Sequence, residues 1–342
     1  MSGAGGSLPR YIGQRVLLII PMIFILLTLV FLVLRVAPGD PITAAVGNKL
    51  SPAALKQRQH DAGFDRPLAV QYLDYLGSVA RLDFGTTITD KQPVMEVVKQ
   101  NGGATLELTF VAFIIALLIG LPLGIIAARF RDSVGDVVIR LFGIVTYAAP
   151  VFFVGLLAQL LFTLKLGWLP GSSEASPITT FTVPTKTHIL LVDALISGDG
   201  GAIKDVLLHL IMPATTLGIL ICGVFIRLVR VNVLQTLQAD YVEAARARGI
   251  GESRVLRKHA FRNALVPVVT VIGLQVALLM SGAVLTESTF NWPGIGSKLI
   301  AYINNRDYVA VQGLITVFAM VVVLMSLLVD IVNALIDPRV RY

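Results

Sequence analysis

The residues of this 342-residue chain whose types and spacing favour a specific task lie in one segment, residues 238–251. Asp240 and Glu243 have the spacing of a capping box, with Asp in place of Ser or Thr. The alanines and arginines that follow are good helix formers, and Gly249 is a typical residue for the end of a helix. The sequence therefore predicts a short helix, a sharp turn at Gly249, and a second helix from about Ser253.

Two interpretations of this pair of helices remain open. The small side chains of Ala244 and Ala245 would let the first helix approach a partner protein closely. Arg246 and Arg248 would also suit a basic helix lying on anionic lipid. The position of the segment between two long apolar stretches, together with its small apolar face, favours the protein partner.

Enzymatic chemistry finds little support. No G-x-x-x-x-G-K-[ST] phosphate loop occurs, and residues 294–298 match it only loosely and read as a tight turn. Neither H-E-x-x-H nor G-x-S-x-G is present. The single cysteine, Cys222, can form no disulfide within the chain and reads as a small buried side chain. The four histidines are scattered and predict no metal site: His60, His188, His209 and His259.

The composition is that of a membrane protein, since 55% of the residues are hydrophobic and only 14% are charged. Six stretches are long and apolar enough to cross a bilayer. They are approximately Tyr11–Leu34, Thr105–Ala128, Val137–Leu166, Leu207–Val229, Ala264–Leu285 and Val309–Ile336. Five contain a proline, which we interpret as a kink in each: Pro21, Pro122, Pro150, Pro213 and Pro267.

Basic residues predict the orientation. They crowd the second and fourth connections, precede the first span and follow the last, all on one side of a six-span protein. The positive-inside rule makes that side the cytoplasm, with both termini there. The net charge of +7 thus indicates basic cytoplasmic loops rather than nucleic-acid binding. The basic residues of the fourth connection are Arg227, Arg230, Arg246, Arg248, Arg254, Arg257, Lys258 and Arg262.

The first outside segment, residues 36–103, is too long for a simple connection. We expect one short helix from Ser51 to Gly63 and a second from Pro67, with an apolar stripe that includes Tyr72, Tyr75 and Val79. This segment reads equally well as a lid on the membrane domain or as a docking surface for an extracytoplasmic binding protein. The third connection, residues 167–205, reads as loop with one short helix around 188–196.

Few ionisable residues fall within the spans. Arg35 and Glu107 are expected near the outer ends of their helices, where their side chains can reach the interface. Asp330 is expected to pair with a cytoplasmic arginine rather than transfer protons. Gln159 and Gln275 could line a polar path, although bonding between helices is their commoner role.

Glu243-Ala244-Ala245 followed by Gly249 resembles the E-A-A-x-x-x-G loop of binding-protein-dependent ABC importer permeases. Other blocks resemble the dipeptide and oligopeptide branch of that family, and the large segment after the first span is similar to its B-type membrane subunit. These blocks run nearly end to end: residues 35–41, 65–68, 71–72, 248–249, 254–256, 259–260, 262–267, 292–296, 305–308 and 337–342.

The resemblance implies a type I ABC importer permease fold: an all-α membrane protein of six transmembrane helices with an extracytoplasmic helical insertion. Residues 1–35 would be the tail and first span, 36–103 the insertion, and 104–342 the permease core. The coupling loop, 238–263, would contact an ATPase subunit through Asp240, Glu243, Ala244, Ala245, Arg248 and Gly249.

The implied protein is not an enzyme, and no cofactor is implied. Its partners would be a second homologous permease subunit, two ATP-binding subunits and an extracytoplasmic solute-binding protein, in the inner or plasma membrane. The cargo would be dipeptides or oligopeptides, and relatives in this branch carry nickel complexes, glutathione or oligosaccharides instead. The sequence leaves the residues of the substrate path unassigned.

Three other classes were weighed. A secondary carrier would need acidic residues near the midplane or paired broken helices in repeated halves. A membrane enzyme would need a nucleophile and base, or a set of metal ligands, within the bilayer. A membrane scaffold or receptor would transport nothing. The sequence supports none of these as well as it supports the importer.

Overall fold

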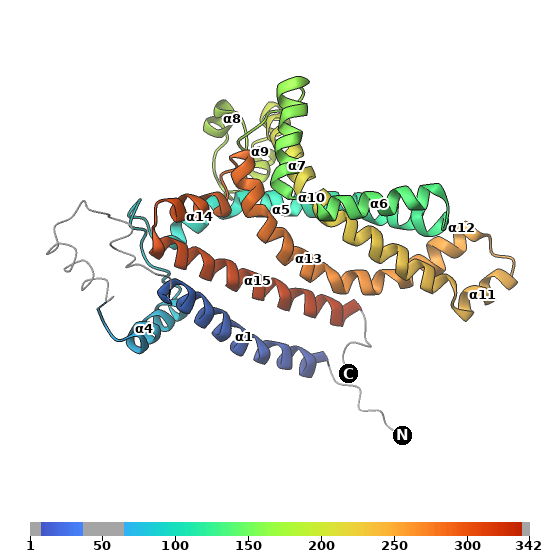
Figure 1. The fold of residues 1–342 in the computed structure, drawn as a ribbon, viewed down its shortest axis with the longest axis horizontal. Helices are drawn as coiled ribbons and strands as arrows, with labels where there is room; N and C mark the ends of the chain where they lie inside the picture. Colours follow the sequence, from blue (N-terminus) through green and yellow to red (C-terminus); the bar gives the residue numbers. More distant parts are fainter. Residues whose placement is uncertain (1–7, 37–64, 337–342) are drawn as a thin grey trace.

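The computed structural model describes residues 8–36 and 65–336 (Figure 1). Within these ranges the chain is helical and contains no β-strand, only an isolated bridge between Thr86 and Pro93. The expected helix at Ser51–Gly63 lies outside the described residues. Five prolines were expected to act as kinks, and four of them lie inside continuous helices: Pro21, Pro122, Pro213 and Pro267.

Two long helices, α5 (Val94–Arg129) and α10 (Gly200–Leu237), form the centre of the bundle. They share the most extensive helix–helix contact in the described part of the chain. The contact side of α5 carries the buried residues Ala112 and Ala116, so the two backbones approach closely. Cys222 on α10 is fully buried in the same cluster, as expected for a small apolar side chain.

A second layer is formed by α1 (Leu8–Val36), α15 (Tyr308–Ile336) and α4 (Leu68–Ala80) (Figure 1). The Nη1 atom of Arg15 lies 3.2 Å from Oδ2 of Asp330, which confirms the predicted pairing of that carboxylate. The ring of Tyr75 stacks on Phe31 of α1, and its hydroxyl lies 2.8 Å from the Thr316 hydroxyl of α15. The helix predicted from Pro67 thus packs on the bundle.

The third expected span is broken. It consists of α6 (Val134–Ala148), α7 (Val151–Ala158) and a π-helical stretch, η2 (Gln159–Lys165), and the two halves meet at an angle of 104°. Our prediction of a simple kink at Pro150 was wrong. Ala149 and Pro150 are both extended, so the helix ends and restarts there rather than bending.

The third connection holds two short helices, α8 (Pro177–Thr182) and α9 (Leu190–Ser197), where one was predicted. Glu107 of α5 is buried beside α9, and one carboxylate oxygen accepts a hydrogen bond from the Leu191 backbone N–H at 3.3 Å. The expectation that Glu107 reaches the interface was therefore wrong, because α5 begins at Val94 rather than near Thr105 and places Glu107 well inside the helix.

After α13 (Phe261–Phe290) the chain turns back through α14 (Ile295–Asn304). The buried Glu287 carboxylate accepts hydrogen bonds from the Thr105 hydroxyl at 2.7 Å and the Ser297 backbone N–H at 2.9 Å. A Cβ on Gly294 would lie 2.2 Å from the Glu287 carboxyl carbon, so glycine is needed for this approach. The glycine-rich residues 294–298 therefore wrap around a carboxylate at a helix start.

Four helices of the described residues are long and apolar enough to cross a membrane, and the bent pair would be a fifth. The four are Arg10–Arg35, Val94–Arg129, Gly200–Leu237 and Tyr308–Val332. The remaining predicted span, Ala264–Leu285, lies within α13.

Candidate functional site

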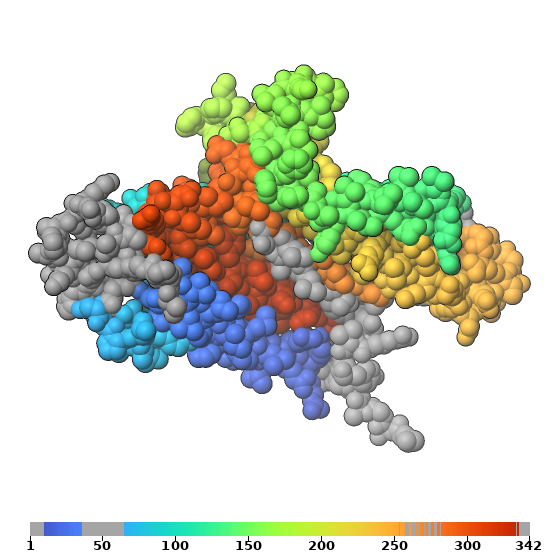
Figure 2. All heavy atoms as spheres, viewed as in Figure 1, coloured from blue at the N-terminus to red at the C-terminus, as the bar shows by residue number. Residues whose placement is uncertain are grey.

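The predicted helix pair is present at one end of the molecule, where it protrudes beyond the bundle (Figures 1 and 2). Its first helix is α11 (Asp240–Ala247). The residue before it, Ala239, is extended, and no side chain caps the helix. The predicted capping box is therefore wrong by one residue, because Asp240 already has helical backbone. Asp240 and Glu243 instead lie in the first turn, where negative charge favours the helix dipole.

Gly249 ends α11 as predicted, with a positive φ of +76°. Its N–H donates to the Arg246 carbonyl at 2.8 Å, and the Ile250 N–H donates to the Ala245 carbonyl at 3.3 Å. This pair of bonds is a Schellman motif, in which the residue after the helix adopts a left-handed conformation. The turn at Gly249 thus sets the direction in which the chain leaves α11 and enters the second helix.

The turn closes over a small core of its own. Val242, Ala245 and Val255 are buried together, with Leu237 and Ile250 packed against them. Ala245 therefore faces the inside of the knob, by which we mean residues 239–256. Our expectation that both alanines are available to a partner was wrong for Ala245, and only Ala244 is exposed.

Charged side chains cover the outside of the knob. Asp240, Glu243 and Arg248 are exposed. Arg246 pairs with Glu252 across the turn, with Nε to Oε1 at 2.7 Å and Nη2 to Oε2 at 3.3 Å. The guanidinium of Arg246 holds the pKa of Glu252 below its ordinary value. The knob therefore presents both signs of charge around one small residue.

The second helix of the knob continues directly into the bundle. Short helix α12 (Glu252–Arg254) and the π-helical stretch η3 (Val255–Ala260) lead into α13 without a break. The other side of the knob is connected to α10 by two residues, Gln238 and Ala239. A displacement of the knob would therefore reach two long helices.

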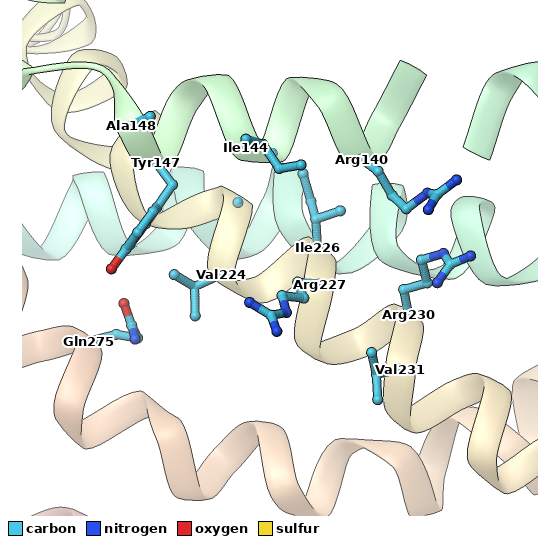
Figure 3. Close-up of a pocket in the computed structure, with 12 residues that line it drawn as sticks. Arg140, Ile144, Tyr147, Ala148, Val224, Ile226, Arg227, Arg230, Val231 and Gln275 are labelled. Atoms are coloured by element: carbon cyan, nitrogen blue, oxygen red, sulfur yellow. The ribbon is translucent and has the colours of Figure 1, made fainter. Parts of the chain in front are cut away.

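A second site lies between α6, α10 and α13, where a cleft of about 610 Å³ opens on the surface (Figure 3). Arg140 and Arg230 lie at one end of it and bracket the buried carboxylate of Asp136. Arg230 donates two hydrogen bonds of 2.7 Å to Asp136, and Arg140 lies 3.4 Å from it. Arg227, Tyr147 and Gln275 line the other part of the cleft.

Arg227 and Arg230, counted with the fourth connection from the sequence, lie in α10, which continues to Leu237. The two glutamines differ. Gln159 donates to the carbonyls of Gly171 at 2.6 Å and Thr289 at 3.1 Å, which is the predicted role in packing. Gln275 is buried and lines the cleft.

The sequence matches the family model of binding-protein-dependent transport system inner membrane components over residues 120–342. The N-terminal domain of the same transport systems matches residues 8–109. The chain belongs to this family. Members are permease subunits of ABC transporters, so this permease is not an enzyme, and ATP hydrolysis occurs in separate subunits.

Curated relatives match almost the whole permease. It is 40% identical over 333 residues to the di/tripeptide transport system permease protein DppB of Pseudomonas aeruginosa, covering 97% of this chain and 98% of the relative. It is 36% identical over 335 residues to the dipeptide transport system permease protein DppB of Escherichia coli, covering 97% and 99%. The glutathione transport system permease protein GsiC of Pectobacterium atrosepticum is 34% identical over 97% of this chain and 99% of its own length.

A solved structure shares the fold. The MetNI methionine ABC transporter, in an inward-facing form, aligns with a TM-score of 0.53 and 16% identity. The match covers 71% of this chain and 97% of that chain. The permease fold therefore extends over most of this molecule.

Proposed function

We propose that this permease forms half of the translocation path of an ATP-driven importer of dipeptides or oligopeptides. The observation that supports a peptide cargo is the 40% identity, over nearly the full length of both chains, to a permease named for di- and tripeptides. A glutathione cargo is the second candidate, because a permease named for that tripeptide matches the same 97% of this chain.

We infer that α11 docks on an ATP-binding subunit. The protrusion of the knob from the end of the bundle supports this role (Figure 2). Ala244 would face the partner, and Asp240, Glu243 and Arg248 would form polar contacts around it. Ala245 and Gly249 would act indirectly, because the first fills the core of the knob and the second sets its turn.

We further propose six spans, with α13 as an additional span and both termini in the cytoplasm. The ends of α5 and α10 and the start of α6 lie at the same end of the molecule as α11 (Figure 1). Arg129 ends α5 and Arg131 lies between α5 and α6, so basic residues occur at this end, which agrees with the positive-inside rule. Residues 36–103 would form the extracytoplasmic insertion, and residues 104–342 the permease core.

The proposed complex contains a second permease subunit, two ATP-binding subunits and an extracytoplasmic solute-binding protein. The exposed apolar surface of α6 supports contact with the second permease or with lipid. Its large exposed apolar side chains are Val134, Val137, Val138, Leu141, Phe142, Ile144, Val145 and Tyr147.

Cysteine cross-linking tests the docking of α11. Ala244→Cys should form a disulfide with a cysteine scan of the ATP-binding subunit, whereas Thr180→Cys on the exposed side of α8 should not. Cross-links at Thr180 instead of Ala244 would overturn the assignment of the docking face. Competition between labelled dipeptide and glutathione for uptake by the complete complex would separate the two cargo proposals.

A further inference from the structure

The cleft between α6, α10 and α13 runs along the bundle, from Arg140 in the second turn of α6 to Gln275 in α13. Gln275 is at the middle of the 30-residue α13, about 21 Å from either end at 1.5 Å per residue. Tyr147 lies at the end of α6 beside the 104° break, and Arg227 is about 15 Å inside the end of α10. A volume of about 610 Å³ is in the range of small-ligand sites.

The cleft carries an excess of positive charge. Three arginines line it, and the carboxylate of Asp136 pairs with two of them, Arg140 and Arg230. Among the residues that the structure describes, none provides an ion pair or hydrogen bond to the guanidinium of Arg227. The Arg227 side chain is exposed where it lines the cleft. Arg227 is therefore available for an anionic group.

Gln275 contributes an independent observation. Its side chain is only 5% exposed, and no described residue donates a hydrogen bond to its Oε1 atom. Such buried, unsatisfied oxygens are rare in folded proteins and call for a donor. Figure 3 shows the Gln275 side chain and the Tyr147 hydroxyl pointing toward one another across the cleft, with Arg227 extending into the same space. An acceptor, a hydroxyl and a guanidinium thus face one volume.

We propose that this cleft is a peptide-binding site on the translocation path. There, Arg227 binds the C-terminal carboxylate of the peptide and Gln275 accepts a hydrogen bond from a peptide N–H. This inference rests on the proposed peptide cargo. A guanidinium suits a carboxylate because it offers charge-assisted, often bidentate hydrogen bonds. The permease would then recognise the free C-terminus of the cargo in addition to any selection by the binding protein.

Photo-labelling of the complete reconstituted complex tests the proposal. Two dipeptides would carry a benzophenone on the second or on the first residue, and each would be delivered by the same binding protein. The variants are Arg227→Gln and Arg227→Lys. The control is Arg131→Gln, since Arg131 is exposed and pairs only with its neighbour Asp132 among the described residues.

In the unmodified complex the probe on the second residue should label α6 or α10 near the cleft, and the probe on the first should label elsewhere. Loss of one charge-assisted bond should lower C-terminal labelling and peptide uptake roughly tenfold in Arg227→Gln. Arg227→Lys should retain most labelling, and Arg131→Gln all of it. Gln275→Leu, which removes the acceptor, should reduce uptake about threefold to tenfold with the complex intact.

Equal labelling and uptake in Arg227→Gln and the unmodified complex would overturn the proposal. So would loss of the second permease from the purified Arg227→Gln complex, because Arg227 would then pair with that subunit. Failure of the unmodified complex to take up any peptide would refute the proposed function as well. Normal uptake that is indifferent to Arg227 would refute this inference alone.

Discussion

Replacing Gly249 with valine tests the shape of the knob most sharply. Gly249 has a φ of +76°, and a Cβ built there meets nothing within 4 Å. The cost of a side chain therefore comes from the backbone conformation and not from a clash. The left-handed conformation raises the free energy of an ordinary residue by about 1–2 kcal/mol, and that of a β-branched residue by at least the upper value.

A cost of about 2 kcal/mol lowers the ratio of bent to opened knob about 30-fold. The bonds from Gly249 to Arg246 and from Ile250 to Ala245 would be lost, and α12 would point away from its present direction. We expect Gly249→Val to weaken association with the ATP-binding subunit or to uncouple hydrolysis from uptake. Gly249→Asn should be milder, because asparagine tolerates the left-handed region.

Gly251 provides a matched control two residues away. Its φ is −61°, and no atom lies within 4 Å of a Cβ built on it. Gly251→Val should therefore behave like the unmodified permease. The assay is ATP hydrolysis and peptide uptake measured in the same proteoliposomes, with the amount of co-purified ATP-binding subunit. Equal effects of Gly249→Val and Gly251→Val would refute the reasoning, because the left-handed conformation would then be irrelevant.

Four further substitutions test docking, packing, charge pairing and protonation. Ala244→Leu should weaken ATP-binding subunit association without lowering the melting temperature, whereas Ala245→Leu should lower the melting temperature by overfilling the knob; identical melting curves would contradict this assignment. Asp136→Asn should destabilise the permease by roughly 3–5 kcal/mol, because it leaves Arg230 without its buried partner; an unchanged denaturant midpoint would count against that pairing. Burial and the charge of Glu107 raise the pKa of Glu174 from 4.5 to about 8. The contribution of Glu174 to stability should therefore fall as pH rises from about 5 to 8, and Glu174→Gln should reduce the slope of stability against pH in thermal unfolding.

The local features of the knob could be predicted because neighbouring residues determine them. Gly249 and the helix formers before it predict where α11 ends. The start of α11 was misplaced by one residue, because Asp is the better N-cap by local preference and yet the extended residue before the helix is Ala239. The burial of Ala245 depends on Val255, which reaches it only after the turn has formed.

The larger features required tertiary information. At Pro150 the two halves of the span meet at an angle of 104°, whereas Pro122 and Pro213 lie in continuous helices. The sequence around each proline does not distinguish these outcomes. Arg227 lies in α10, which continues to Leu237, and the sequence alone does not show how far that helix extends. The cleft joins residues from three helices that are far apart in sequence, so no local pattern indicates it.

The central claim is that this permease imports peptides only with ATP-binding partners, through the knob. The most direct measurement is uptake of a labelled dipeptide into proteoliposomes that contain the permease pair and the binding protein, with and without ATP-binding subunits. We predict uptake only when those subunits and ATP are present, and a large loss of uptake with Gly249→Val. Uptake driven by a proton gradient without any ATP-binding subunit would contradict the account.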